Sequence, residues 1–254
     1  MSRQANYEMG NYYRRRRNWQ AALTYFERVK GEIPFSTGFE LEALYHLGRD
    51  KDYLQRHNEL LEQGLSTVVS GALASHAAIE LGADVENSFC PSPMDFIFSQ
   101  QLESDETFIS DALAKIEKIG DFRNQSLLHN GDQTAGVLLY DEPFLRQQLE
   151  RIIRAAVLRY CEAFASIDTP YLRILRNSPL TINAWAISMK THGFLRPHIH
   201  EYGWLSGTLY LKIPPKSDAR EGDIAFSTAG GDYPTKSAGH VEKTVSVQEG
   251  LINL

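Results

Sequence analysis

The spacing of apolar residues changes from a helical to an alternating pattern along this chain, and this change restricts the possible folds most. From residue 6 to about 63, and again from 105 to about 160, apolar side chains recur every three or four positions, which predicts amphipathic helices. Beyond Pro179 they alternate in residues 181–189, 204–213, 223–226 and 244–254, which predicts short strands. The order of these elements predicts an α+β fold with helices first and strands last.

Composition narrows the class of protein further. The chain has 254 residues, 43% hydrophobic and 23% charged, so we expect one large or two modest globular domains. A net charge of −6 argues against a nucleic-acid binder, and the absence of a run of about 18 apolar residues argues against a membrane span. Two cysteines, Cys90 and Cys161, are too few for a disulfide scaffold, and the first residues lack the apolar stretch of a secretory signal. We therefore expect a cytoplasmic protein.

The first helical segments have the spacing of a tetratricopeptide repeat. The small, aromatic and helix-breaking positions of that repeat correspond to Gly10, Tyr13, Ala22, Phe26 and Pro34. A following pair of helices, about 39–47 and 52–61, resembles a degenerate second repeat, although a generic helical hairpin remains an alternative. Residues 14–17 are all arginine, and we expect this cluster to face solvent at the end of a helix. Such repeats would bind a protein or peptide partner.

Three domains follow from these patterns. Residues 1–70 form the helical domain that is similar to tetratricopeptide repeats, and residues 71–104 form a helical and irregular linker. The linker begins within an expected helix over residues 68–81 and then contains turn-forming residues between 87 and 93. Residues 105–254 combine covering helices with short strands, which predicts a β-sandwich or jelly roll.

The chemistry is expected at His198 and His200. In an extended segment, side chains two residues apart point to the same face, so both imidazoles would meet there. Two neutral imidazoles make half of a transition-metal site. The alternative is a pair of histidines with unrelated hydrogen bonds, which is the more common outcome for an arbitrary pair. Here the pair precedes a strand that would be buried in a jelly roll, which places it at the mouth of the barrel.

Around this pair the chain resembles a family of 2-oxoglutarate/Fe(II)-dependent oxygenases, whose bacterial members often carry tetratricopeptide repeats ahead of the oxygenase domain. The resemblance covers about residues 120–254. It rests on two groups of residues: Gln125, Ser126, Leu127, Gln133 and Thr134 in the first, and Trp185, Gly193, Phe194, Pro197, His198, Ile199, His200, Trp204, Leu205, Ser206, Gly207, Tyr210 and Pro214 in the second.

The resemblance implies a double-stranded β-helix, which is a jelly roll flanked by helices. It implies that Fe(II) is bound at the barrel mouth, that 2-oxoglutarate is the cosubstrate, and that O2 oxidises a substrate C–H bond with release of succinate and CO2. By motif position His198 is the first metal ligand, and His200 lies where better-known oxygenases have a carboxylate. No catalytic residue beyond the metal ligands is implied. Tyr210 and Asn183 are candidates for contacts with 2-oxoglutarate, and Tyr210 could equally be a core aromatic residue.

The family pattern continues past residues 250–254 with a Phe-Pro-Ser turn, a distal histidine ligand and a basic residue. We therefore expect a truncated jelly roll that lacks its last strands and part of its site. His240, His192 and Asp223 are candidates for replacement ligands. The favoured alternatives are that the two histidines are solvated and that Asp223 is a polar residue at a strand start.

Three functions are consistent with these observations. The leading one is an iron oxygenase with a repeat-type interaction domain. The second is a binding module with a catalytically inactive β-domain. The third is a cupin-like metal enzyme, which would require a glutamate about four residues after the second histidine, where this chain has Trp204 and Leu205.

Overall fold

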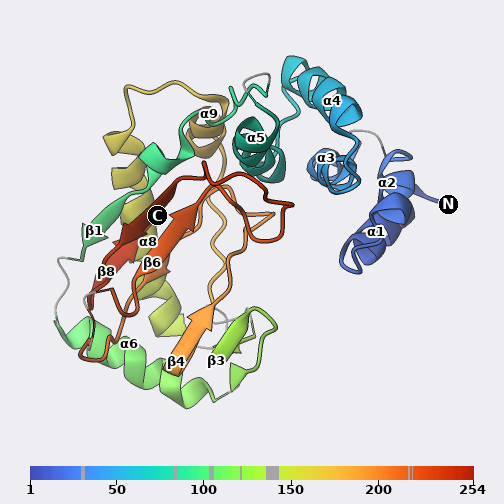
Figure 1. Ribbon diagram of the computed structural model, residues 1–254. Helices are drawn as coiled ribbons and strands as arrows, with labels where there is room; N and C mark the ends of the chain where they lie inside the picture. The colour runs from blue at the N-terminus through green and yellow to red at the C-terminus, as the bar shows by residue number, and fades with distance from the viewer. Residues whose placement is uncertain are drawn as a thin grey trace.

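The computed structural model describes residues 1–29, 32–82, 85–102, 106–120, 122–135, 143–216, 218 and 220–254. Figure 1 shows α1 to α5 on one side of the molecule and the strands on the other. Both helices and antiparallel strands are present, so the predicted α+β class is confirmed. No helix in the described part of the chain is both long and apolar enough to cross a membrane.

The N-terminal half consists of paired helices. Local capping signals mark the starts of some of them: Asn18 accepts a hydrogen bond from the backbone of Ala21 before α2, and Thr67 forms a capping box before α5. A Cβ atom at Gly10 would overlap the ring of Phe26, so this glycine allows α1 and α2 to approach closely. The helices are α1 (Arg3–Arg14), α2 (Trp19–Phe26), α3 (Ser36–His46), α4 (Asp50–Glu62) and α5 (Val68–Leu81). Their identity as tetratricopeptide repeats stays a prediction.

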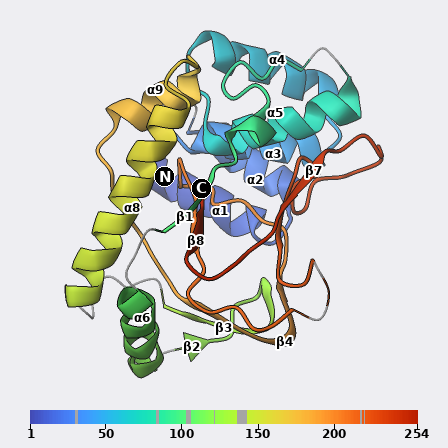
Figure 2. The same cartoon turned by 90° about the vertical axis from the view of Figure 1, so that its left-hand side faces the viewer.

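The later helices cover the strands. Apolar side chains of α6 (Glu106–Ile119) and α8 (Pro143–Ala163) share one core cluster, and Figure 2 shows both helices on the same side of the strands. The helix α9 (Pro170–Asn177) was not predicted from the sequence, although Thr169 caps it and Pro170 occupies its first turn. The short 3-10 helix η1 (Pro93–Phe96) follows the turn residues expected around positions 87–93.

The strands form three small antiparallel sheets. One has the order β1–β8–β5, the second β2–β3–β4, and the third pairs β6 with β7. Their bounds are β1 (Ser99–Gln101), β2 (Phe122–Arg123), β3 (Leu128–Thr134), β4 (Ile187–Leu195), β5 (Thr208–Leu209), β6 (Ile224–Ser227), β7 (Glu242–Val245) and β8 (Leu251–Asn253). The double-stranded β-helix stays a prediction.

Several strands are shorter than the alternating pattern predicts. The expected strand over residues 181–189 begins only at Ile187 and continues to Leu195. Of residues 204–213 only Thr208 and Leu209 pair as a strand, because Trp204 and Leu205 instead pack against a buried aromatic core. Alternation therefore located the β-rich region but not the limits of its strands.

Residues from the expected linker take part in the C-terminal sheet. β1 pairs with β8, with Ser99 opposite Asn253 and Gln101 opposite Leu251. The side chain of Ser99 donates a hydrogen bond to that of Asn253 at 2.6 Å. The C-terminal strand thus pairs on both edges, with β1 and with β5. The three domain limits themselves stay a prediction.

One face of the helical half packs against the C-terminal half. We call this the inner face, and define it by side chains on α1, α3 and α5: Tyr7, Arg14, Phe39, Glu42, Tyr45, His76 and Glu80. The Tyr7 and Tyr202 hydroxyls are 3.1 Å apart, and the ring of Tyr233 lies 6.3 Å from that of Tyr45 and 5.1 Å from that of His76. The helices form two successive pairs, α1 with α2 and α3 with α4, and α5 follows them. The inner face uses α1, α3 and α5, so its contacts with the C-terminal half extend along the whole helical half.

Candidate metal centre

The imidazoles of His198 and His200 converge. Their Nε2 atoms are 3.0 Å apart and their ring centroids 4.9 Å apart. Residues 196–200 belong to no strand of a sheet, so the ladder of a sheet does not hold the pair in place. The chain turns directly after His200, where the amide of Gly203 donates to the carbonyl of His200.

The outer nitrogen of each ring has a partner of its own. Nδ1 of His198 lies 2.8 Å from the carbonyl oxygen of Arg196, and Nδ1 of His200 lies 2.7 Å from the hydroxyl of Ser206. A carbonyl only accepts, so Nδ1 of His198 carries the proton and Nε2 presents a lone pair to His200. The Ser206 hydroxyl can accept from Nδ1 of His200 in the same way. Partners of this kind orient histidines that ligate metals.

These two nitrogens fit one metal ion. Two ligands about 2.1 Å from the same ion and at right angles to each other lie about 3 Å apart, which is the separation of the Nε2 atoms. Burial, followed by the neighbouring His198, lowers the pKa of His200, so its uncharged form, which ligates metals, is favoured. Among the described residues, no third His, Cys, Asp or Glu joins this pair.

The walls of the centre come from neighbouring segments. The ring of Trp185 stands edge-on to that of His200 with centroids 5.3 Å apart. The loop after β6 approaches from another side, where a Cβ atom at Gly231 would lie 2.6 Å from the carbonyl oxygen of Pro197. This close approach requires glycine at position 231. His198 itself is exposed, so the centre is open to solvent.

The two groups of residues that carry the family resemblance lie side by side. The amide of Arg196 donates to the carbonyl of Leu127 at 2.9 Å, and Leu128 pairs with Leu195 across β3 and β4. At the other end of β3, the hydroxyl of Thr134 accepts from the amide of Ala186 at 2.9 Å. The first group therefore supports the backbone that leads into His198.

The candidate contacts for 2-oxoglutarate, Asn183 and Tyr210, have different surroundings. Asn183 is exposed and precedes β4, two residues before Trp185. Burial raises the pKa of Tyr210, and its hydroxyl forms hydrogen bonds with Asn253 and Thr208. Within the described part of the chain, no hydrogen bond joins either side chain to His198 or His200.

The replacement ligands considered from sequence have other partners. His240 lies 2.8 Å from Glu80 on α5, and Asp223 forms an ion pair with Lys216 at 2.6 Å. The Lys216 ammonium is the main reason that the pKa of Asp223 is lowered. His192 is an exposed residue of β4 with a φ of 60°. None of the three is hydrogen-bonded to the histidine pair.

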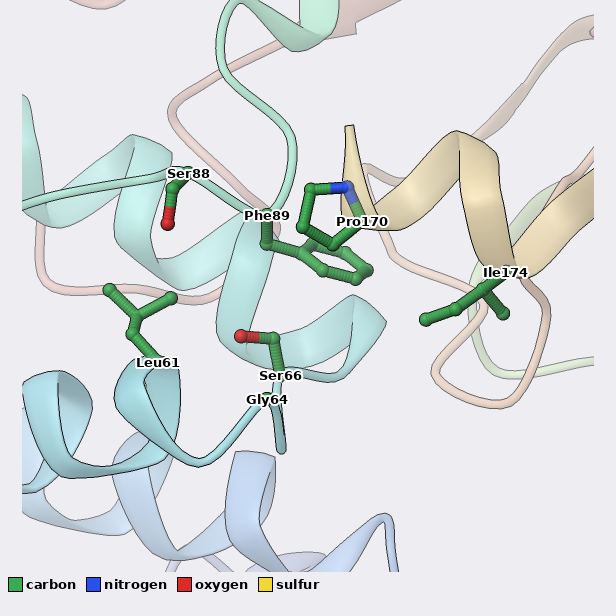
Figure 3. Close-up of a pocket in the computed structure, with 7 residues that line it drawn as sticks. All are labelled: Leu61, Gly64, Ser66, Ser88, Phe89, Pro170 and Ile174. Carbon is green, nitrogen blue, oxygen red and sulfur yellow. The ribbon is translucent and has the colours of Figure 1, made fainter. Parts of the chain in front are cut away.

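A hollow of about 250 Å³ adjoins the residues that precede His198. Arg17, Arg196 and Asp232 contribute charged side chains to its lining, and Arg17 and Asp232 form an ion pair at 2.8 Å. A second cavity, shown in Figure 3, lies between Leu61 and α9 and measures about 60 Å³. Its lining is apolar apart from two serines, and its volume is well below the few hundred Å³ of typical ligand sites.

The inner face contacts the turn that follows His200. This contact was not predicted from the sequence. Arg14 was expected to face solvent, but this expectation is wrong, since its side chain is only 9% exposed. Its guanidinium forms ion pairs with Glu42 of α3 and with Glu201, and it lies 4.0 Å from the ring centroid of Phe39. The contacts between Arg14 and Glu201 join residues 187 positions apart, so no local pattern reveals them.

Comparison with known proteins finds a similarity in one part of the chain. The model of the family described as "Putative 2OG-Fe(II) oxygenase" matches residues 183–254. That segment contains His198, His200 and Ser206. No curated protein matches the chain, and no solved structure does.

Proposed function

We propose that this protein is a 2-oxoglutarate- and Fe(II)-dependent oxygenase of the hydroxylase type. The observation that carries the proposal is the convergence of the His198 and His200 Nε2 atoms, 3.0 Å apart, within the segment that matches the oxygenase family. The carbonyl of Arg196 and the hydroxyl of Ser206 support it, because they hold the outer nitrogens in the orientation that metal ligation needs.

The residues of the centre have different roles in the proposed reaction. Bound Fe(II) with 2-oxoglutarate supplies the oxidation of a C–H bond, with release of succinate and CO2. His198 and His200 would hold the ion through Nε2, and each would keep its proton on Nδ1. The ring of Trp185 excludes water from one side of His200. These roles use two protein ligands and leave the remaining positions for the cosubstrate, O2 or a further ligand.

The anionic cosubstrate needs cations, and the hollow that adjoins Arg196 and Pro197 is lined by two arginines, one of them already paired with Asp232. Arg17 and Arg196 line it, and a guanidinium pairs with a carboxylate through two hydrogen bonds. We propose that this hollow admits the carboxylates of 2-oxoglutarate or of an acidic substrate. Tyr210 and Asn183 stay as proposed contacts for the cosubstrate.

The test is turnover of 2-oxoglutarate by the metal-loaded chain. We expect succinate to form only when Fe(II), 2-oxoglutarate and O2 are all present, and His198→Ala and His200→Ala to lower the rate at least 100-fold. The matched control is His192→Asn, which removes an exposed imidazole six residues earlier at a position whose positive φ suits asparagine. Equal rates in His198→Ala and in the unaltered chain would refute the proposal.

A second candidate function is an inactive binding module with repeat-type helices. The specific observation in its favour is that no third ligand group joins the pair among the described residues. The protein or peptide partner would have to use another surface than the inner face, because Tyr202, Glu201 and Tyr233 of the same chain cover that face. Iron binding without any succinate formation would favour this candidate.

A further inference from the structure

A second cluster of metal-ligating groups lies away from the histidine pair. His76 and Glu80 are one turn apart on α5 and therefore share a face of that helix. His240 joins them from the segment between β6 and β7, which Figure 1 shows extending toward α5. One ligand atom from each of the three residues lies within 4.8 Å of the other two.

The cluster is closed to solvent. His76 is fully buried, and the side chains of Glu80 and His240 are only 6% and 7% exposed. The Glu80 carboxylate accepts from Nε2 of His240 at 2.8 Å and from the amides of Lys236 and Ser237. These hydrogen bonds, that of His240 foremost, lower the pKa of Glu80 to about 2, so the carboxylate is ionised at neutral pH.

The imidazole of His76 has an unusual pair of neighbours. Its Nδ1 lies 3.3 Å from the carbonyl oxygen of Thr228, and its Nε2 lies 3.3 Å from that of Pro234. An uncharged imidazole carries one N–H and can satisfy only one of these acceptors. Its other nitrogen then directs a lone pair at an oxygen atom, and a cation at that nitrogen would remove the repulsion.

The outer atoms of the cluster are also arranged as in metal sites. The hydroxyl of Thr228 lies 3.3 Å from Nδ1 of His240, and the carbonyl of the same residue lies beside Nδ1 of His76. One residue thus contacts Nδ1 of both imidazoles. Hydrogen bonds of this kind fix the ring orientation of ligating histidines.

We propose that His76, Glu80 and His240 form a second metal site that binds Zn²⁺ or a similar divalent transition metal. Two imidazoles and one carboxylate are a donor set for zinc, whereas Ca²⁺ and Mg²⁺ prefer oxygen ligands alone. The three side chains are largely shielded from solvent, so we assign the site the structural role of joining α5 to the segment between β6 and β7. A water molecule would complete the four ligands that Zn²⁺ prefers.

The experiment measures metal binding in a chain whose first site has been removed. The His198→Ala, His200→Ala double variant is stripped with EDTA and titrated with Zn²⁺ by calorimetry and with Co²⁺ by visible absorption. We expect one equivalent of Zn²⁺ to bind and to raise the melting temperature. The Co²⁺ complex should absorb as a four-coordinate site, and activity as an oxygenase is not needed for any of these measurements.

Two further changes in that background assign the ligands. Glu80→Gln keeps the shape of the side chain, and His240→Ala removes one imidazole; each should weaken Zn²⁺ binding at least 100-fold. His129→Ala is the control, because it removes an exposed imidazole of β3 and should leave binding unchanged. Should Zn²⁺ fail to bind the double variant, or bind equally well after Glu80→Gln, the three residues are a hydrogen-bonded cluster and the proposal is wrong.

Discussion

Arg14 of α1 forms an ion pair with Glu201, the residue that directly follows the candidate ligand His200. Arg14 also pairs with Glu42 of α3, so one guanidinium connects two helices to the turn after the histidine pair. The adjacent Tyr202 contacts Tyr7 through its hydroxyl and the ring of Phe39 edge-on. The helical half therefore supports the candidate metal centre directly and is more than an appended module.

Replacing Arg14 should destabilise the protein and weaken its metal centre together. Arg14→Met leaves the Glu42 and Glu201 carboxylates facing each other without their cation. Burial raises the pKa of Glu42 and Arg14 opposes this, so Glu42 should take up a proton in the variant. We expect a loss of roughly 3 kcal/mol in the free energy of unfolding, measured with urea, and weaker Fe²⁺ binding at the histidine pair.

Two variants separate the loss of the ion pair from a general effect of removing an arginine. Glu42→Gln added to Arg14→Met should restore part of the lost stability, because a neutral amide needs neither the missing cation nor the uptake of a proton. Arg16→Ala is the control, since the Arg16 side chain is exposed and stacks only on Tyr12. An effect of Arg16→Ala as large as that of Arg14→Met would contradict the specific role of Arg14.

Ser206 should tune the affinity of the histidine pair for metal without affecting the fold. Ser206→Ala removes the hydroxyl 2.7 Å from Nδ1 of His200 and leaves that ring free to rotate. We expect Fe²⁺ affinity to fall about 10- to 100-fold, as for other outer partners of ligating histidines. Unfolding by urea should change little because Ser206 is exposed. The titration is done in a His240→Ala background, so that only the first centre is measured.

Gly207 should be intolerant of any side chain. A Cβ atom there would lie 2.7 Å from the carbonyl oxygen of Asn253 and 2.5 Å from a methyl group of Leu254. Gly207→Ala should therefore disturb the pairing of β5 with β8 and cost roughly 1–3 kcal/mol of unfolding free energy. Gly203→Ala is the matched control, because the nearest atoms there are 3.6 Å away. Equal stability of the two variants would show that β8 adjusts to the added methyl group.

The sequence predicts elements well where the determining signals are local. The helix expected over residues 68–81 is α5 (Val68–Leu81), because the Thr67 capping box at its start and Gly82 at its end are both readable from neighbouring residues. The strand expected over residues 204–213 is much shorter, since packing of Trp204 against Phe89, 115 positions earlier, outweighs the alternating pattern.

For the candidate site, the sequence indicates the histidine pair but not the residues that support it, and the role of the pair as metal ligands stays a prediction. The spacing of His198 and His200 predicts that they meet, and their Nε2 atoms are 3.0 Å apart, although residues 196–200 belong to no strand. Ser206 belonged to the recognised motif, but nothing in its position six residues later indicated contact with His200. The pairing of Glu80 with His240 joins residues 160 positions apart, so only the tertiary structure reveals it.

His46 should make the stability of the protein depend on pH between about 4 and 6.5. The ring of His46 stacks on that of Trp19, with the ring centroids 3.9 Å apart, and Nε2 of His46 is buried without a hydrogen-bond partner. Burial lowers the pKa of His46 to about 4, while the charge of Asp232 acts in the opposite direction. The unfolded chain, with a histidine pKa near 6.5, therefore binds more protons in this range. Stability is present above pH 6.5 and is lost as the pH falls toward 4, by on the order of 2 kcal/mol.

The measurement is urea unfolding at pH 7, 5.5 and 4.5 in EDTA, compared between the unaltered chain and His46→Gln. The variant cannot take up the proton, so its unfolding free energy should fall less over this range. Because His76 and His200 also have lowered pKa values and are present in both proteins, only the difference between the two slopes reports on His46. His129→Gln serves as the control, since it removes an exposed imidazole and should leave the slope unchanged. Parallel curves for His46→Gln and the unaltered chain would mean that His46 is protonated as readily in the folded protein as in the unfolded one.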